Sequence, residues 1–216
     1  MFLVAAYFLI AATLCSLWYW VSVRRNRRRA KEVARWVESA LYGQGQVVGI
    51  RWLTPSRFRL PLRLTCGLFH RASVVVQMTP CEMPFRWALS KFRGHQEVLS
   101  FEADLDLPPN FSLDVQNFRW FARSSRRTPR NRNGWTFEQT GPLVMSTRSD
   151  WQKEITSAMT SLAHGSHEFS NIIFQRRSPH FAVTLPLESV APGAPDRACL
   201  FESMREVASS ASASLF

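Results

Sequence analysis

The sequence lacks the local signatures of the common enzymes. It contains no glycine-rich phosphate loop, no dinucleotide-binding glycine pattern, no zinc-protease histidine pair and no serine nucleophile elbow. It has only four cysteines, and no two of them are separated by two residues, so the usual zinc and redox motifs are absent and a secreted disulfide framework is disfavoured. A non-enzymatic function is therefore favoured over an enzymatic one, and neither a metal nor a cofactor is expected.

Acidic residues are also few, since 16 Asp and Glu stand against 27 Lys and Arg. The basic excess belongs to the first part of the chain: residues 1–132 hold 21 basic and 8 acidic residues, whereas residues 133–216 hold 6 and 8. Only three of the 27 basic residues are Lys, a bias that the base composition of a genome can also produce. Apolar residues make up 46% of the chain, with 16 Phe and 8 Trp, which excludes a disordered chain.

The longest segment without a charged side chain is at the N-terminus, over residues 2–23. As a helix these residues would extend about 33 Å, and the hydrocarbon core of a bilayer is about 30 Å thick. Aromatic residues at its end, Trp18, Tyr19 and Trp20, match the belt expected at a membrane interface. The adjoining basic segment, residues 24–31, carries Arg24, Arg25, Arg27, Arg28, Arg29 and Lys31. We therefore predict a transmembrane anchor whose contacts with the lipid bilayer include these nine residues.

The order of charge along the anchor predicts its orientation. No cationic side chain precedes the apolar run and six follow it, so the positive-inside rule places the N-terminus outside and the following domain in the cytoplasm of a cell-membrane protein. A cleaved signal peptide would need the reverse order, with its charges before the apolar run. A buried core helix would not need flanking arginines.

The remainder predicts one cytoplasmic α+β domain over residues 32–208, followed by a disordered tail at 209–216. Helices are expected at 31–42, 83–92, from Ser149, and at 196–208. Strands are expected at 46–53, 57–65, 70–78, 97–107, 111–121, on either side of Gly141–Pro142 within 135–145, and at 169–175 and 181–187. In the strand at 97–107 the apolar alternation includes Val98 and Phe101, and Ser100 is out of phase. Hairpins dominate, so the sheet should be mainly antiparallel with about three helices packed on it. The order helix, glycine loop, strand, proline turn and strand occurs twice, which suggests two α-β-β repeats or chance similarity of two hairpins.

Several polar groups are candidates for chemistry, and each has a structural alternative. Four soft ligands, Cys66, His70, Cys81 and His95, match no zinc pattern. Another pair, His164 and His167, falls at an expected helix end, where histidine caps the last carbonyls. Three carboxylates, Glu102, Asp104 and Asp106, share one face of an expected strand, and could act in metal or acid-base chemistry or pair with arginines on neighbouring strands.

An arginine-rich segment with neighbouring aromatics is the remaining candidate site. Its basic residues are Arg119, Arg123, Arg126, Arg127, Arg130 and Arg132. Arginines beside aromatic residues can bind single-stranded nucleic acid. In a membrane-tethered chain, anionic headgroups or a protein partner are nearer, and a solvated loop is the simplest alternative.

Together these features predict a single-pass membrane protein whose cytoplasmic domain binds or scaffolds without catalysis. Its expected partners are the lipid bilayer and another protein or a second copy. The alternatives are a membrane-tethered enzyme acting on a lipid or envelope precursor, and membrane-localised nucleic-acid binding through the arginine-rich segment, which is the least favoured.

Overall fold

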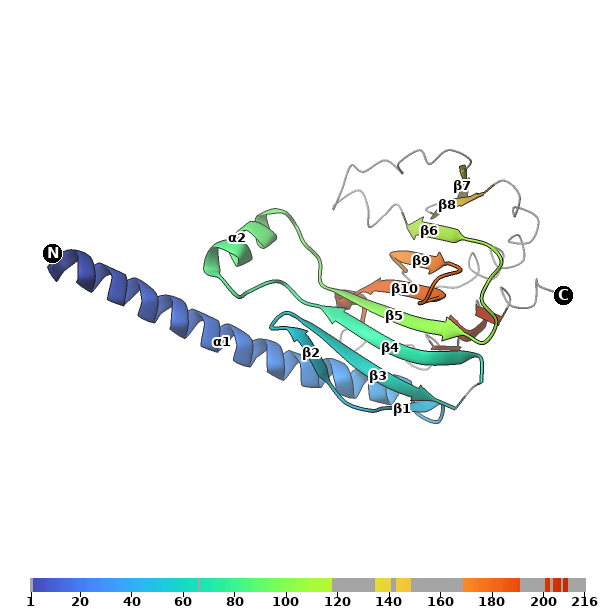
Figure 1. Cartoon of the computed structure of the whole chain (residues 1–216), viewed down its shortest axis with the longest axis horizontal. Helices are drawn as coiled ribbons and strands as arrows, with labels where there is room; N and C mark the ends of the chain where they lie inside the picture. Colours follow the sequence, from blue (N-terminus) through green and yellow to red (C-terminus); the bar gives the residue numbers. More distant parts are fainter. Residues whose placement is uncertain are drawn as a thin grey trace.

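A long N-terminal helix and one antiparallel sheet dominate the computed structural model (Figure 1). The structure describes residues 2–65, 67–117, 135–140, 143–148, 169–190, 201–202, 204–206 and 208–209. This architecture agrees with the predicted α+β class.

Helix α1 (Phe2–Ala40) is continuous from the apolar run into the domain. Of the helices described, it alone is long and apolar enough to cross a membrane. Its first part is exposed, whereas Ala30, Val33 and Val37 in its last part are buried in the core. The helix predicted at 31–42 is thus the inner end of α1. The chain then turns at Gly43, whose φ of 79° lies in the left-handed region that favours glycine.

Ten strands are described, and every pairing among them is antiparallel. They are β1 (Gly45–Val47), β2 (Arg51–Thr54), β3 (Arg57–Leu64), β4 (Phe69–Gln77), β5 (Val98–Leu105), β6 (Leu113–Asn117), β7 (Trp135–Thr140), β8 (Leu143–Arg148), β9 (Asn171–Phe174) and β10 (Phe181–Pro186). Their order in the sheet is β1-β3-β4-β5-β10-β9-β6-β8-β7, and β2 pairs with β3 beside β1. Helix α2 (Pro84–Phe92) lies between β4 and β5 in the chain, and a 3-10 helix, η2 (Leu187–Val190), follows β10.

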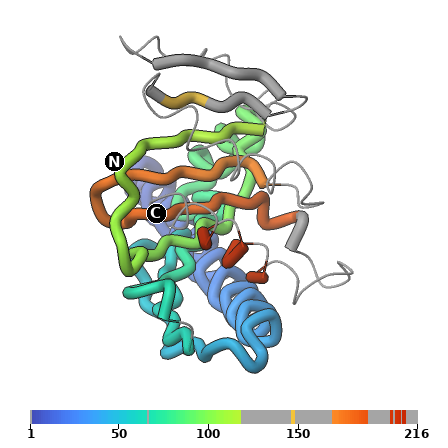
Figure 2. Tube along the Cα trace, turned by 90° about the vertical axis from the view of Figure 1, so that its right-hand side faces the viewer, coloured from blue at the N-terminus to red at the C-terminus, as the bar shows by residue number. Residues whose placement is uncertain are grey.

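The core lies between one face of this sheet and the helices. Figure 2 shows the inner half of α1 and the C-terminal helical residues on the same side of the strands. Phe101 of β5 is fully buried at the centre, with ring centroids 5.5 Å from Phe69 and 5.7 Å from Phe201. Alternate residues of β3, Phe58, Leu60 and Leu62, point to this core, as their spacing predicts.

Two details of the strand predictions are wrong. The strand predicted at 46–53 is divided into β1 and β2, because the residues between them face Pro61 of β3, which has no N–H to donate to a ladder. In β5 we expected Val98 in the buried stripe and Ser100 out of phase. Instead Leu99 begins the buried stripe, and Ser100 belongs to the polar face with Glu102.

Most other elements agree with the sequence patterns. Strands β4, β7 and the β9–β10 hairpin lie within about a residue or two of the predicted ranges, and β8 extends three residues beyond the predicted end at Met145. The helix predicted at 83–92 is α2. The loop at 124–134, the helix from Ser149 with His164 and His167, and most of the C-terminal tail lie outside the described residues. The α-β-β repeat therefore stays a prediction.

Candidate functional site: the junction of the anchor and the domain

One face of α1 contacts the domain well before the apolar run ends. Trp18 is half-buried, and its ring lies 5.5 Å from the ring of Trp87 in α2, edge to face. Its indole Nε1 donates a hydrogen bond to the Cys81 carbonyl at 3.2 Å. Ser22, Asn26 and Ala30 continue this face at four-residue spacing, so they lie one above another along the helix. The contact between α1 and the domain thus extends from Trp18 to the core.

Asn26 is the central polar contact of this junction. It is only 8% exposed, although arginines precede and follow it in the chain. Its Nδ2 donates to the Pro55 carbonyl at 3.1 Å and lies 2.9 Å from the Cys81 Sγ. One amide thereby connects α1 to the β2–β3 turn and to the segment that leads into α2. We did not predict this role. A usable signal was present, because Asn26 is the only uncharged residue between Arg24 and Arg29 and lies four positions before Ala30.

Cys81 is a buried thiol at the same junction. Burial raises the pKa of Cys81, and hydrogen bonds from Asn26 and Ser22 oppose that effect only in part. The thiol is therefore protonated at neutral pH, and a protonated thiol is a poor nucleophile and metal ligand. The chemistry of this group suits packing better than catalysis.

A cavity of about 430 Å³ opens between α1, α2 and the start of β5. Its walls include the cations Arg25, Arg29 and Lys91 and the carboxylates Glu97 and Glu188. Arg29 forms an ion pair with Glu97 at 3.0 Å, whereas among the described residues neither Arg25 nor Lys91 does. Within the described part of the chain, the cavity therefore combines one ion pair with two cations that form none, and Lys91 lies 5.6 Å from the centre of the Trp87 ring.

Glu97 has a structural role in this wall. Its Oε1 accepts hydrogen bonds from the Thr79 backbone N–H at 3.2 Å and from the Thr79 hydroxyl at 3.1 Å, while its Oε2 faces Arg29. Both oxygens are thus engaged, and the carboxylate joins α1 to the segment before α2. These contacts make Glu97 a positioning group for the junction.

The predicted membrane-interface residues fall into two groups. Tyr19 and Trp20 are exposed, as are Arg24, Arg25, Arg27, Arg28 and Lys31, and the Arg24 guanidinium lies 5.2 Å from the centre of the Trp20 ring. These side chains are free to face lipid. Trp18 and Arg29 instead face the domain through Trp87 and Glu97.

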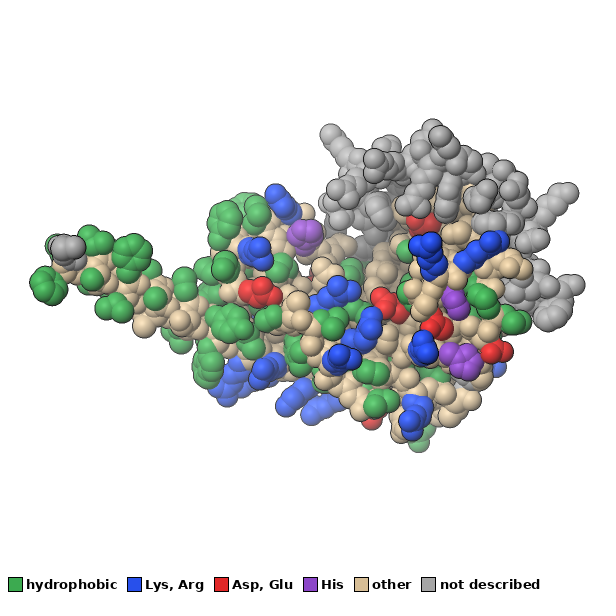
Figure 3. Space-filling model, viewed as in Figure 1, with side chains coloured by type: hydrophobic (Ala, Val, Ile, Leu, Met, Phe, Trp, Pro, Cys, Tyr) green, Lys and Arg blue, Asp and Glu red, His purple; other side chains and the backbone are tan. Residues whose placement is uncertain are grey.

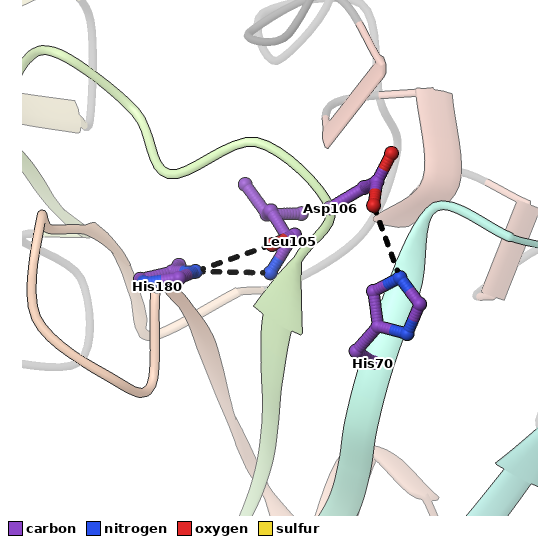
Figure 4. Close-up of polar contacts among 4 residues, drawn as sticks. All are labelled: His70, Leu105, Asp106 and His180. Atoms are coloured by element: carbon purple, nitrogen blue, oxygen red, sulfur yellow. Dashed lines mark hydrogen bonds and ion pairs between the residues drawn. The ribbon is translucent and has the colours of Figure 1, made fainter.

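The three carboxylates of β5 and the following turn do not form one site. Glu102 pairs with Arg59 at 3.1 Å, two strands away. Asp106 Oδ1 lies 3.2 Å from His70 Nε2, and both side chains are largely exposed (Figure 4). On the other side of β5, His180 Nδ1 accepts a hydrogen bond from the Leu105 N–H at 3.2 Å (Figure 4). Pairing with an arginine of another strand, which we considered as the structural alternative, is thus present for Glu102, whereas Asp106 faces a histidine.

Of the four soft-ligand candidates, the structure places two in one site. Cys81 and His95 both line the cavity, His70 instead pairs with Asp106, and Cys66 lies outside the described residues. Within the part of the chain that the structure describes, no three His, Cys, Asp or Glu side chains are grouped to hold a metal. The arginines from Arg119 to Arg132 also lie outside the described residues, so their role stays a prediction.

No protein-family model matches this chain, and no curated protein matches it. The junction of α1 with the domain is therefore interpreted from its own geometry and chemistry.

Proposed function

We propose that this chain is a single-pass membrane protein whose cytoplasmic domain binds a partner protein, or a second copy of itself, without catalysis. The observation that carries the proposal is the continuity of α1. The same unbroken helix has an exposed apolar half and a half whose Ala30, Val37 and Ala40 are core residues.

This continuity distinguishes a scaffold from a loosely tethered domain. A flexible linker would let the domain sample many heights and orientations above a bilayer. Here Trp18, Asn26 and Arg29 each connect α1 to the domain, in addition to the buried apolar side chains. A surface of the domain would thus be held at a fixed distance from the membrane, which suits recognition of another membrane-bound component.

The cytoplasmic placement depends on the basic segment that follows the apolar run. Six cations within residues 24–31 favour the inner leaflet, with about 1 kcal/mol of attraction to anionic lipid for each residue near the surface. The predicted contacts of Arg119 to Arg132 would add a basic surface for an anionic partner.

Membrane insertion and orientation can be tested together. Ile10 and Leu14 are exposed on the apolar half of α1, and arginine near the centre of a transmembrane helix costs about 2.5 to 3.5 kcal/mol per residue. The Ile10→Arg/Leu14→Arg variant should be extracted from membranes at alkaline pH, whereas wild type and an Ile10→Leu/Leu14→Ile control should be retained. In sealed vesicles with the cytoplasmic face outward, protease should digest the wild-type domain. Retention of the arginine variant, or a protected domain, would contradict the anchor or its orientation, respectively.

Partner binding needs a separate experiment. We expect chemical crosslinking in native membranes, followed by purification in mild detergent, to recover the chain with a protein partner or with a second copy. A strictly monomeric chain that recovers no partner would contradict the scaffold function while leaving the anchor intact. Among the described residues, Cys81, Glu97 and Glu102 are engaged in contacts of the fold, so these three side chains do not favour the enzymatic alternative.

A further inference from the structure

Helix α2 exposes an unusual amount of apolar surface for its length. Met83 just before it and Phe85 and Phe92 within it are 61%, 75% and 89% exposed. Phe85, Leu89 and Phe92 follow the spacing i, i+4, i+7 and therefore share one side of the helix. On the other side, Trp87 packs against Trp18 of α1 and Ser90 is buried. Contiguous apolar surface of this kind marks a site of contact with a protein or a membrane.

The position of α2 beside the anchor identifies the membrane as the better match. Trp87 of α2 contacts Trp18, which lies five residues before the end of the apolar run at Val23. That separation is about 7.5 Å along a helix, and interfacial helices bury their apolar face about 5 to 10 Å deep at the boundary of headgroups and acyl chains. If α1 spans the bilayer, α2 is held at this depth.

The charge of α2 agrees with this placement. Within Pro84–Phe92 there are two cations, Arg86 and Lys91, and no acidic residue, and Arg93 follows directly. Hydrophobic side chains gather over α2 with cations among them, on the side where the free half of α1 projects (Figure 3). An apolar face bordered by cations is the composition expected of a helix that lies on an anionic leaflet.

A bilayer would also stabilise α2 itself. A nine-residue helix is marginal in water, and α2 begins without a side-chain cap at Met83. The Trp18–Trp87 contact supports only its inner side.

We propose that α2 is a second membrane contact, which inserts Phe85 and Phe92 into the headgroup–acyl boundary of the leaflet from which α1 emerges. The proposal rests on the anchor function of α1. The cavity between α1 and α2 would then open at the level of the headgroups, with Arg25 and Lys91 facing them.

Photocrosslinking from the bilayer tests this proposal on the full chain. The protein is reconstituted in nanodiscs of phosphatidylcholine and phosphatidylglycerol that contain a lipid with a diazirine near the top of its acyl chain, and labelled peptides are identified by mass spectrometry. We expect labels both on the apolar half of α1 and on residues 83–92. Labelled α1 with unlabelled α2 would overturn the present proposal alone, whereas absence of label on α1 would contradict the anchor.

Matched variants make the assignment specific. Phe85→Ser/Phe92→Ser should lower labelling of α2 about tenfold or more without changing that of α1, because each buried Phe contributes about 1.5 to 3 kcal/mol. Phe85→Leu/Phe92→Leu should keep the labelling. Tyr42→Ser is the control, since Tyr42 is 91% exposed but lies two residues beyond the C-terminal end of α1. Unchanged labelling of α2 in the serine variant, at unchanged thermal stability, would refute insertion of these side chains.

Discussion

Replacing Asn26 with alanine tests whether one buried amide fixes the domain to helix α1. The substitution removes the hydrogen bond to the Pro55 carbonyl and the contact with the Cys81 sulfur, at 3.1 and 2.9 Å. It leaves the helix backbone intact, and alanine is the best helix former. Any loss of stability therefore comes from the contacts at the junction and not from a weaker helix α1.

The expected decrease in the free energy of unfolding follows from these contacts. A neutral hydrogen bond contributes about 1 kcal/mol, and a carbonyl left without its partner in a buried site costs about 1 to 3 kcal/mol. The sulfur contact is weaker, and the better helix propensity of alanine returns about 0.5 kcal/mol. The net loss should be about 1 to 2 kcal/mol, which corresponds to a melting temperature lower by about 2 to 8 °C for a chain of this size.

The assay is thermal unfolding of the full chain in nanodiscs, followed by tryptophan fluorescence. Arg28→Ala is the control, because Arg28 lies on the exposed side of α1 only two residues away, and surface substitutions usually change stability by less than about 0.5 kcal/mol. If Asn26→Ala melts at the wild-type temperature, or if Arg28→Ala lowers it equally, the junction does not depend on this amide.

Four further predictions concern the junction and the core. Trp18→Ala should increase hydrogen exchange over residues 79–97 while Trp20→Ala should not, because Trp18 contacts Trp87 and Cys81 whereas Trp20 is exposed. Glu97→Ala should lower the melting temperature more than Glu97→Gln, because glutamine keeps an oxygen for Thr79; equal effects would show that only the ion pair with Arg29 matters. Burial raises the pKa of Cys81, so as pH rises the thiol loses its proton in the unfolded chain before it does in the folded chain. The free energy of unfolding should therefore fall above about pH 8.5. In thermal melts at several pH values, Cys81→Ala should lack that part of the decline. Phe101→Ala should cost about 3 to 5 kcal/mol in chemical unfolding and leave membrane retention unchanged, since its ring lies among Phe69, Phe181 and Phe201.

Local patterns in the sequence predicted most of the elements. The alternation of Phe58, Leu60 and Leu62 with polar residues identified β3 and its buried face, because a strand places alternate side chains on opposite sides. The four-residue spacing of Val33 and Val37 likewise identified the inner half of α1. Both signals arise within one element, so no knowledge of its partners was needed.

The errors came from information carried by other elements. The division of β1 from β2 depends on Pro61, which lies on the neighbouring strand. The burial of Asn26 depends on Pro55 and Cys81, 29 and 55 residues further along the chain. Within its own segment Asn26 is simply one polar residue among arginines, and helical spacing from Ala30 was the only local indication of its orientation.

For helix α2 too, the sequence predicted the element but not its surroundings. The sequence predicted a short helix at 83–92, but the pattern did not say what its apolar side faces. The contact between Trp87 and Trp18 supplies that information, because it places α2 beside the end of the apolar run, which would define the depth of α2 if α1 spans a bilayer. The candidate site therefore emerges from combining a local hydropathy signal with one non-local contact.

Two membrane contacts would constrain the domain more than one. A single transmembrane helix can tilt by up to about 40° in any direction, so an anchor alone fixes the height of the domain better than its inclination. If α2 also lies in the interface, tilts that lift it from the headgroups become unfavourable, and the domain leans consistently toward the side of α2. A partner in the same membrane would then meet one presented surface, which lowers the orientational entropy lost on binding. Disrupting α2 should accordingly weaken partner binding in a bilayer more than in detergent, where both contacts are equally solvated.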